Sequence, residues 1–258
     1  MKSRTAVAAA AFCALYVGTA SANVDQQELD MLKTAKDVEI CSQKIAKAYF
    51  YKQLDIRADQ ADTDMKESLS QLQSSIKKLA AGSGDSKDEK NINKFLAYTH
   101  SELDSMLSKP YTKEAGALMI DYSESLLEGA NNLGGKHKGK GAEAGMIAEV
   151  DQLLFLLERV NKYYIAHKAG FKDYNNVVQL EKAVKDFEDG LAKINAYSSY
   201  PENVQANVQN INKFWPVAKE FYLGVQEQAL PVIVLASTDK LEQEIKALER
   251  FHAQEAVK

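Results

Sequence analysis

The chain has 258 residues, with 32 Lys and Arg against 36 Asp and Glu, which gives a formal net charge of −4 at pH 7. A mildly acidic chain with no basic block is not expected to have nucleic acid as its main partner. Only four prolines, together with frequent Ala, Lys, Glu, Gln and Leu, favour a helical fold.

The first 22 residues have the pattern of a cleaved signal peptide. Two cations, Lys2 and Arg4, precede an apolar run over residues 6–18, and small residues at 20–22 fit the positions that a signal peptidase reads. The run is shorter than the ~20 apolar residues that span a bilayer, and no later stretch approaches that length. We therefore expect the mature chain, from residue 23 onward, to be exported to the periplasm.

Two later segments carry the same apolar stripe, which indicates an internal duplication. The stripes consist of Met65, Leu69, Leu72, Ile76 and Leu79 in the first segment, and of Leu180, Val184, Phe187, Leu191 and Ile194 in the second. Their spacing places each stripe on one face of a helix, and the second stripe follows the first by 115 positions throughout. Residues 91–95 (NINKF) also recur as residues 210–214. Ahead of each copy lies a capping-box pattern, which begins at Ser86 in the first and at Ser199 in the second.

Each copy predicts four helices with short connections. The expected ranges are 25–54, 59–80, 87–108 and 111–132 in the first copy, and 143–168, 172–196, 201–228 and 231–255 in the second. Short connections make successive helices antiparallel neighbours. We therefore predict an all-α chain of two tandem up-down-up-down four-helix bundles. Its parts are a signal peptide at 1–22, a first unit at 23–133, a Gly/Lys linker at 134–142 and a second unit at 143–258.

The motifs of catalysis and cofactor binding are incomplete. Residues 134–140 imitate a phosphate-binding loop, but Gly141 stands where Ser or Thr should hold magnesium, and no strand precedes the segment. Glu249 and His252 have the i, i+3 spacing of carboxylate-bridged metal sites in bundles, yet no other histidine has such a glutamate. A solvated helix end is the simpler interpretation of His252. Since no nucleophile can be matched with a base and an orienting group, we predict no enzyme, no cofactor and no metal site.

Two single residues leave alternatives open. Cys41, the one cysteine of the expected mature chain, lies close to the core stripe of its helix, where it fits as a small buried hydrophobe. The alternative is a redox-sensitive thiol or a disulfide contact between two chains, which an oxidising periplasm permits. Trp215 precedes Pro216 in an aromatic-rich helix, and it either belongs to the core or lines a ligand cleft.

The first helix carries the most specific motif of the chain. Residues 35–50, AKDVEICSQKIAKAYF, resemble the motif of the PilJ-type, NarX-like sensor domain, whose pattern runs approximately A-G-R-Q-R-M-L-S-Q-R-I-A-K-x-Y-L. The match is close from Ser42 to Tyr49, with Lys44 in place of an arginine. That domain is the extracytoplasmic part of type IV pilus chemotaxis transducers, and a relative occurs in nitrate and nitrite sensor kinases. Its four-helix units, often in tandem, agree with the duplication over residues 25–255.

The resemblance implies a ligand site where two first helices meet, because family members bind small anions through basic residues of this helix at a dimer interface. The candidate ligand-binding residues are therefore Gln43, Lys44, Lys47, Arg159 and Lys162, with Trp215 added from the aromatic-rich helix. Asp37 and Glu39 stand where the pattern has arginines, so we do not expect nitrate to bind through the usual ligands. The alternative is that Lys44 and Lys47 lie on a solvated helix face.

Three functions remain open, in order of preference. The first is a periplasmic, sensor-like protein that binds a small molecule and acts with a membrane transducer, without a membrane or output module of its own; a homodimer would fit the resemblance. The second is a non-catalytic helical adaptor or scaffold for a periplasmic or membrane protein. The third is a metal- or haem-carrying helical bundle.

Overall fold

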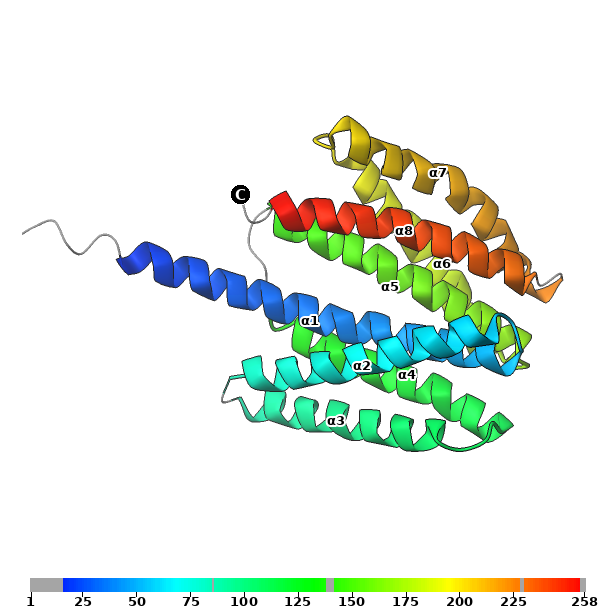
Figure 1. Cartoon of the computed structure of the whole chain (residues 1–258). Coiled ribbons are helices and arrows are strands. Elements are labelled where there is room, and N and C mark those ends of the chain that lie inside the picture. Colours follow the sequence, from blue (N-terminus) through cyan, green and yellow to red (C-terminus); the bar gives the residue numbers. More distant parts are fainter. Residues whose placement is uncertain (1–15, 85, 138–141, 228–229, 256–258) are drawn as a thin grey trace, which may run out of the picture.

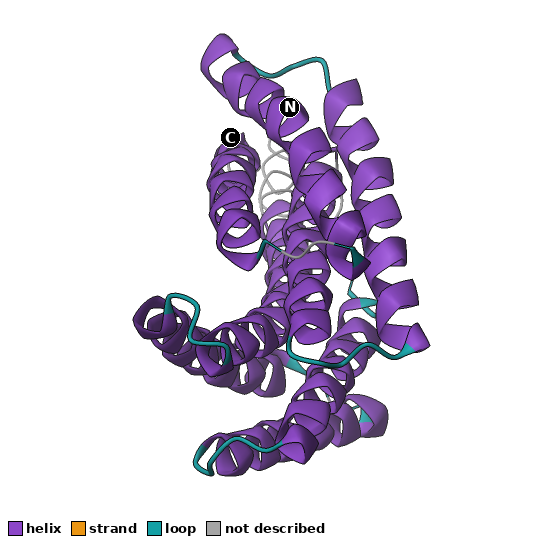
Figure 2. Ribbon diagram, turned by 90° about the vertical axis from the view of Figure 1, so that its right-hand side faces the viewer, coloured by secondary structure: helices purple, strands orange, loops and turns teal. Residues whose placement is uncertain are grey.

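The protein is built of helices over the part of the chain that its computed structural model describes, residues 16–84, 86–137, 142–227 and 230–255. Within these ranges there are eight α-helices and one short 3-10 helix, with no strand (Figure 1, Figure 2). The elements are α1 (Tyr16–Gln53), α2 (Ala58–Gly82), α3 (Lys87–Leu107), α4 (Lys113–Gly134), α5 (Ala142–Lys168), α6 (Tyr174–Ala196), α7 (Glu202–Leu223), η1 (Gly224–Gln226) and α8 (Pro231–Glu255). The predicted all-α fold is confirmed for these residues.

The helices fall into two groups of four that meet along their first members. Helix α1 contacts α2 and α4, and α3 contacts the same two helices. In the other group, α5 contacts α6 and α8, and α7 contacts the same two. Helix α1 also packs along α5, and this pair joins the groups (Figure 1). We call α1 to α4 the first half of the molecule and α5 to α8 the second half.

The central position of α1 and α5 follows from their composition. Residues 153–157 of α5 (LLFLL) are apolar on every side of the helix, and residues 153–167 are buried without a break. In α1, residues 45–51 are buried in the same way. A helix that is apolar all round belongs in the interior. The polar side chains that share these stretches are therefore carried inside, where they need partners.

The two segments that the sequence sets apart from the helical units, the signal peptide and the linker, lie partly outside the described residues. Residues 1–15 of the predicted signal peptide are outside, and residues 16–22 form the start of α1. The predicted linker separates the end of α4 from the start of α5, and its residues 138–141 are also outside. Among the helices that are described, none is long and apolar enough to cross a membrane.

Candidate functional site

Polar side chains of α1 and α5 form two clusters at the junction of the two halves. The basic residues of the two helices are equivalent under the 115-residue offset, with Lys44 matching Arg159 and Lys47 matching Lys162. Each basic pair reaches a glutamate on the last helix of the other half. The α8-side cluster consists of Lys44, Lys47, Glu158 and Glu242, and the α4-side cluster of Gln43, Glu124, Arg159 and Lys162.

The α8-side cluster is a chain of ion pairs that joins α1, α5 and α8. The Nζ atom of Lys47 lies 2.7 Å from Oε2 of Glu158, while Lys44 pairs with Glu242 and lies 3.9 Å from Oε1 of Glu158. Lys246, one turn further along α8, lies 2.7 Å from Oε1 of Glu242. Lys47 is only 5% exposed and Glu158 is fully buried. The alternative of a solvated helix face is therefore wrong for Lys47, because α5 and α8 cover it.

The charges of this cluster reinforce one another. Burial alone would lower the pKa of Lys44 and of Lys47, but the neighbouring carboxylates outweigh it and raise both. Burial would likewise raise the pKa of Glu242, but the charges of Lys47, Lys44 and Lys246 outweigh burial and lower this pKa. For Glu158 burial dominates and raises the pKa, and neither of its oxygens receives a well-directed hydrogen bond. The cluster is thus held by charge, and Glu158 depends on Lys47.

The α4-side cluster satisfies its own hydrogen bonds more completely. Arg159 donates to both carboxylate oxygens of Glu124, at 2.7 Å and 2.9 Å, and to Oε1 of Gln43 at 3.5 Å. Lys162, which is fully buried, donates to Oγ of Ser123 at 3.1 Å and pairs with Glu124. Burial lowers the pKa of Lys162 to about 7, and Glu124 only partly opposes this. A bidentate arginine–carboxylate pair is a strong, directional contact, so this cluster serves as a structural joint.

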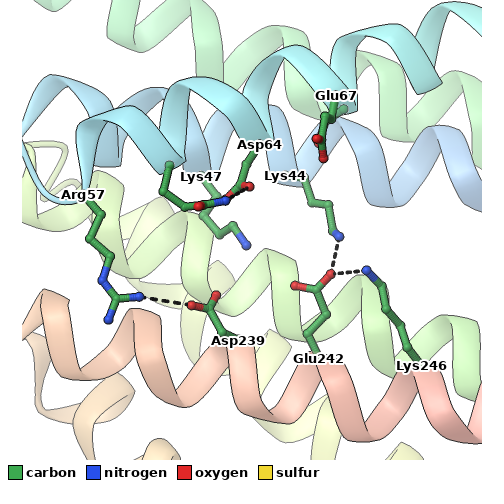
Figure 3. A pocket seen from close by; sticks show the side chains of 10 residues that line it. Lys44, Lys47, Arg57, Asp64, Glu67, Asp239, Glu242 and Lys246 are labelled. Atoms are coloured by element: carbon green, nitrogen blue, oxygen red, sulfur yellow. Dashed lines mark hydrogen bonds and ion pairs between the residues drawn. The ribbon is translucent and has the colours of Figure 1, made fainter.

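A pocket of about 280 Å³ opens beside the α8-side cluster, between α1, α2 and α8 (Figure 3). It is lined by Lys44, Lys47, Arg57, Gln60, Asp64, Glu67, Ser68, Asp239, Glu242 and Lys246. Four of these side chains are cationic and four are carboxylates, so the lining has no net charge. Because α1 and α2 belong to the first half and α8 to the second, any molecule in this pocket would touch both halves.

The edge of the pocket carries a residue in an uncommon backbone conformation. Arg57, which precedes α2, has a φ of 47°, in the left-handed region that non-glycine residues seldom adopt. Its Nη1 atom lies 3.3 Å from Oδ2 of Asp239 on α8. A strained backbone conformation persists when surrounding contacts hold the residue, and such residues cluster at functional sites. Here this conformation places the guanidinium group of Arg57 at the edge of the pocket.

The other candidate residues lie elsewhere. Trp215 of α7 is buried, stacks on Phe187 of α6 at 3.9 Å between ring centroids, and does not line the pocket. Cys41 is a buried free thiol whose pKa burial raises to about 12, as the core interpretation expects. Glu39, at a position where the sensor pattern has arginine, is buried against Lys36, whose Nζ atom lies 2.5 Å away.

The environment of His252 differs from the prediction of a solvated helix end, which is wrong. The side chain is fully buried, with Nε2 2.9 Å from the hydroxyl of Tyr200. The rings of Tyr197 and Phe251 lie edge-on to it, each 5.0 Å away between centroids. The C-terminal part of α8 is therefore packed by aromatic residues. In the described part of the chain, no group of three or more His, Cys, Asp or Glu side chains is arranged to hold a metal ion.

The sequence predicted Lys44 and Lys47 of the pocket but not Lys246, and it did not predict the glutamates of the two clusters. Glu158 lies 115 positions after Gln43, so the repeat that identified Arg159 and Lys162 could also have marked it. Glu124 and Glu242 are 118 positions apart on the last helices of the two halves. Their equivalence becomes visible only once the helices are known to pack against the basic pairs.

Comparison with protein-family models, with curated proteins and with solved structures finds no match to this chain.

Proposed function

We propose that this chain is a non-catalytic, sensor-like protein that binds a small polar molecule in the pocket between α1, α2 and α8. The observation that carries the proposal is the pocket itself, which is charged, open to a ligand and lined by both halves of the molecule. Two of its residues, Lys44 and Lys47, come from the α1 segment that resembles the PilJ-type, NarX-like sensor motif.

The packing of α1 on α5 supports this proposal. We propose that the chain contains two tandem four-helix bundles, whose first helices pair within one molecule as the first helices of two family members would pair in a dimer. The contacts among α1 to α4, among α5 to α8 and between α1 and α5 are consistent with that arrangement. A ligand between α1 and α8 would then shift the halves by a small sliding or rotation.

The ionisation of Lys44, Lys47 and Glu242 favours binding over catalysis. A general acid or base works best when its pKa lies near the working pH. Here the neighbouring charges raise the pKa of Lys44 and Lys47 and lower that of Glu242, so these groups move away from neutrality. Fixed charges of this kind hold and orient a ligand. Export through the signal peptide to the periplasm, and action with a membrane transducer, belong to the same proposal.

The direct test is a thermal-shift screen of the protein against small anions, amino acids and divalent metals. A ligand that binds only the folded state stabilises it by roughly 2.7 kcal/mol at a hundred times its dissociation constant. Lys246→Ala should reduce the shift, since Lys246 lines the pocket. Lys44 and Lys47 are less suitable, because removing Lys47 leaves Glu158 uncompensated in the interior.

Lys240→Ala is the matched control for this test. Lys240 lies on the same helix, is exposed to the same extent as Lys246, and also pairs with a glutamate four residues away at 2.7 Å, but it does not line the pocket. Equal shifts in the two variants would contradict the proposed site, and no shift with any compound would contradict ligand binding.

A helical adaptor is the second candidate, favoured by exposed apolar residues on α3 and α4. Phe95, Tyr98 and Leu118 are 43%, 65% and 42% exposed, and exposed apolar patches often mark protein contacts. The adaptor requires no small ligand, so a screen without any thermal shift would favour it over the sensor.

A further inference from the structure

In the pocket between α1, α2 and α8, three lysines gather around Glu242 on the α1 and α8 side, and two further carboxylates lie on α2. One side of the pocket carries the ammonium groups of Lys44 and Lys47, on α1, and of Lys246, on α8. The other side carries the carboxylates of Asp64 and Glu67, on α2 (Figure 3). We call these the lysine floor and the acidic wall. Arg57 and Asp239, which pair with each other at the edge, neutralise one another and add to neither.

The lysine floor has an excess of positive charge. Its three ammonium groups share two carboxylates: Lys44 and Lys246 both pair with Glu242, and Lys47 pairs with Glu158. One positive charge is therefore left over. Because the pKa values of Lys44 and Lys47 are raised, both lysines are protonated at neutral pH. The floor can therefore accept one carboxylate from a ligand.

The acidic wall has the opposite excess. Asp64 accepts a hydrogen bond at 2.6 Å from the side-chain amide of Gln60, which is neutral, and Glu67 is exposed on the same face of α2. Neither carboxylate is ion-paired within the described residues. These two negative charges would repel an anion that enters the pocket, and the lysine floor would repel a cation. Only a molecule with both charges at opposite ends is attracted by both surfaces.

The pocket volume limits the size of such a molecule. A volume of about 280 Å³ corresponds to roughly nine waters at about 30 Å³ each and stands at the lower end for small-molecule sites. It therefore suits a ligand on the order of ten non-hydrogen atoms.

We infer that the pocket binds a small zwitterion of the free amino acid type, with its carboxylate on the lysine floor and its ammonium on the acidic wall. This inference rests on the proposed function of the same pocket and specifies the ligand class. It also explains why carboxylates lie beside the basic residues of the pocket, although these carboxylates would repel a simple anion.

The test is calorimetric titration of the full protein with the common free L-amino acids. The tightest binder is then compared with its N-acetyl derivative, which lacks the ammonium, and with its amide, which lacks the carboxylate. Each derivative should bind about tenfold more weakly or worse, the effect of losing one charge-assisted contact. A double variant, Asp64→Asn with Glu67→Gln, should weaken the free amino acid while leaving the N-acetyl derivative unchanged or bound more tightly.

The outcomes separate the inference from the function on which it rests. Both α2 residues reach solvent, so the double variant should fold, and Glu181→Gln on the exposed face of α6 is its control. An N-acetyl derivative or an inorganic anion that binds as tightly as the free amino acid, and loses affinity in Lys246→Ala, would overturn the zwitterion but keep the site. An amide that binds as tightly, and loses affinity in the Asp64→Asn, Glu67→Gln variant, would do the same. Absence of binding by every compound would overturn both.

Discussion

Asp151 of α5 is a carboxyl group in the interior that no cation fully compensates. It is 6% exposed. Burial, together with the charges of Glu249 and Asp37, raises its pKa to about 7 against the opposing charges of Lys33 and Lys36. Burial also raises the pKa of Asp37 to about 6, again helped by Glu249. In the folded protein both carboxyl groups therefore bind a proton at a pH well above their ordinary pKa of 3.8.

We predict that Asp151→Asn is stabilising at high pH and much less so at low pH. Because the folded-state pKa is the higher one, the protonated carboxyl favours the folded state below about pH 4, and this contribution is lost as the pH rises through 7. Asparagine has the same shape and never ionises. At about 1.4 kcal/mol per pKa unit, its advantage at pH 8 should exceed that at pH 4 by roughly 2–4 kcal/mol in urea unfolding.

The control is Asp189→Asn on the exposed face of α6. It should show no comparable dependence on pH. A stability difference between Asp151→Asn and the parent that is the same at pH 4 and pH 8 would mean that Asp151 is ionised, or protonated, throughout.

At the level of single residues, the sequence predicted two of the ten residues that line the pocket, Lys44 and Lys47. Lys44 and Lys47 could be found because a motif marks them, whereas Glu242 is almost 200 positions away and belongs to no motif. Helical periodicity gives the face on which a residue lies but not the helix that will cover that face. For the same reason the sequence could not tell a buried Lys47 from a solvated one.

At the level of elements, the sequence predicted each helix to within a few residues at most ends, because stripes and caps define helices locally. Ser86 accepts a hydrogen bond from the amide of Glu89, as its capping box predicts. The prediction of a second capping box at Ser199 is wrong, because α7 begins at Glu202 and Pro201 precedes it without a side-chain cap. Proline has a fixed φ that suits a helix start, so the chain starts the helix there and leaves Ser199 outside.

Two glycines at equivalent places in their helices should respond oppositely to alanine. Gly116 and Gly145 are both the fourth residue of a helix, in α4 and α5. A Cβ on Gly116 would lie 2.4 Å from the ring of Phe171, whereas nothing lies within 4 Å of one on Gly145. We predict that Gly116→Ala destabilises by about 1–3 kcal/mol through overpacking, and that Gly145→Ala stabilises by up to about 1 kcal/mol.

Chemical denaturation of both variants measures this difference. Phe171 lies between α5 and α6, and its ring centroid lies 5.3 Å from that of Phe50 of α1, so the contact at Gly116 is one between the halves. If Gly116→Ala were as stable as Gly145→Ala, the α4 end of the junction would be loose enough to repack around a methyl group.

At the level of the whole molecule, the junction between the halves resembles a core more than a domain interface. Domains within one chain usually meet through modest, rather polar interfaces and move independently. Here α1 and α5 are buried by helices of both halves, and the two clusters tie each first helix to the other half. Removing one half would leave charged side chains of the other without partners.

We therefore predict that the two halves unfold as one cooperative unit. Trp215, the single tryptophan of the chain, lies in α7, so its fluorescence reports on the second half, whereas far-ultraviolet circular dichroism reports on all helices. The two signals should give one coincident transition. Leu72→Ala, at a fully buried position of α2 in the first half, should cost about 2–5 kcal/mol. Its midpoint should fall equally by fluorescence and by circular dichroism, although no residue of α7 is altered. A fluorescence midpoint that stays at the parent value would instead mean that the second half folds on its own and that the pocket joins two independent bodies.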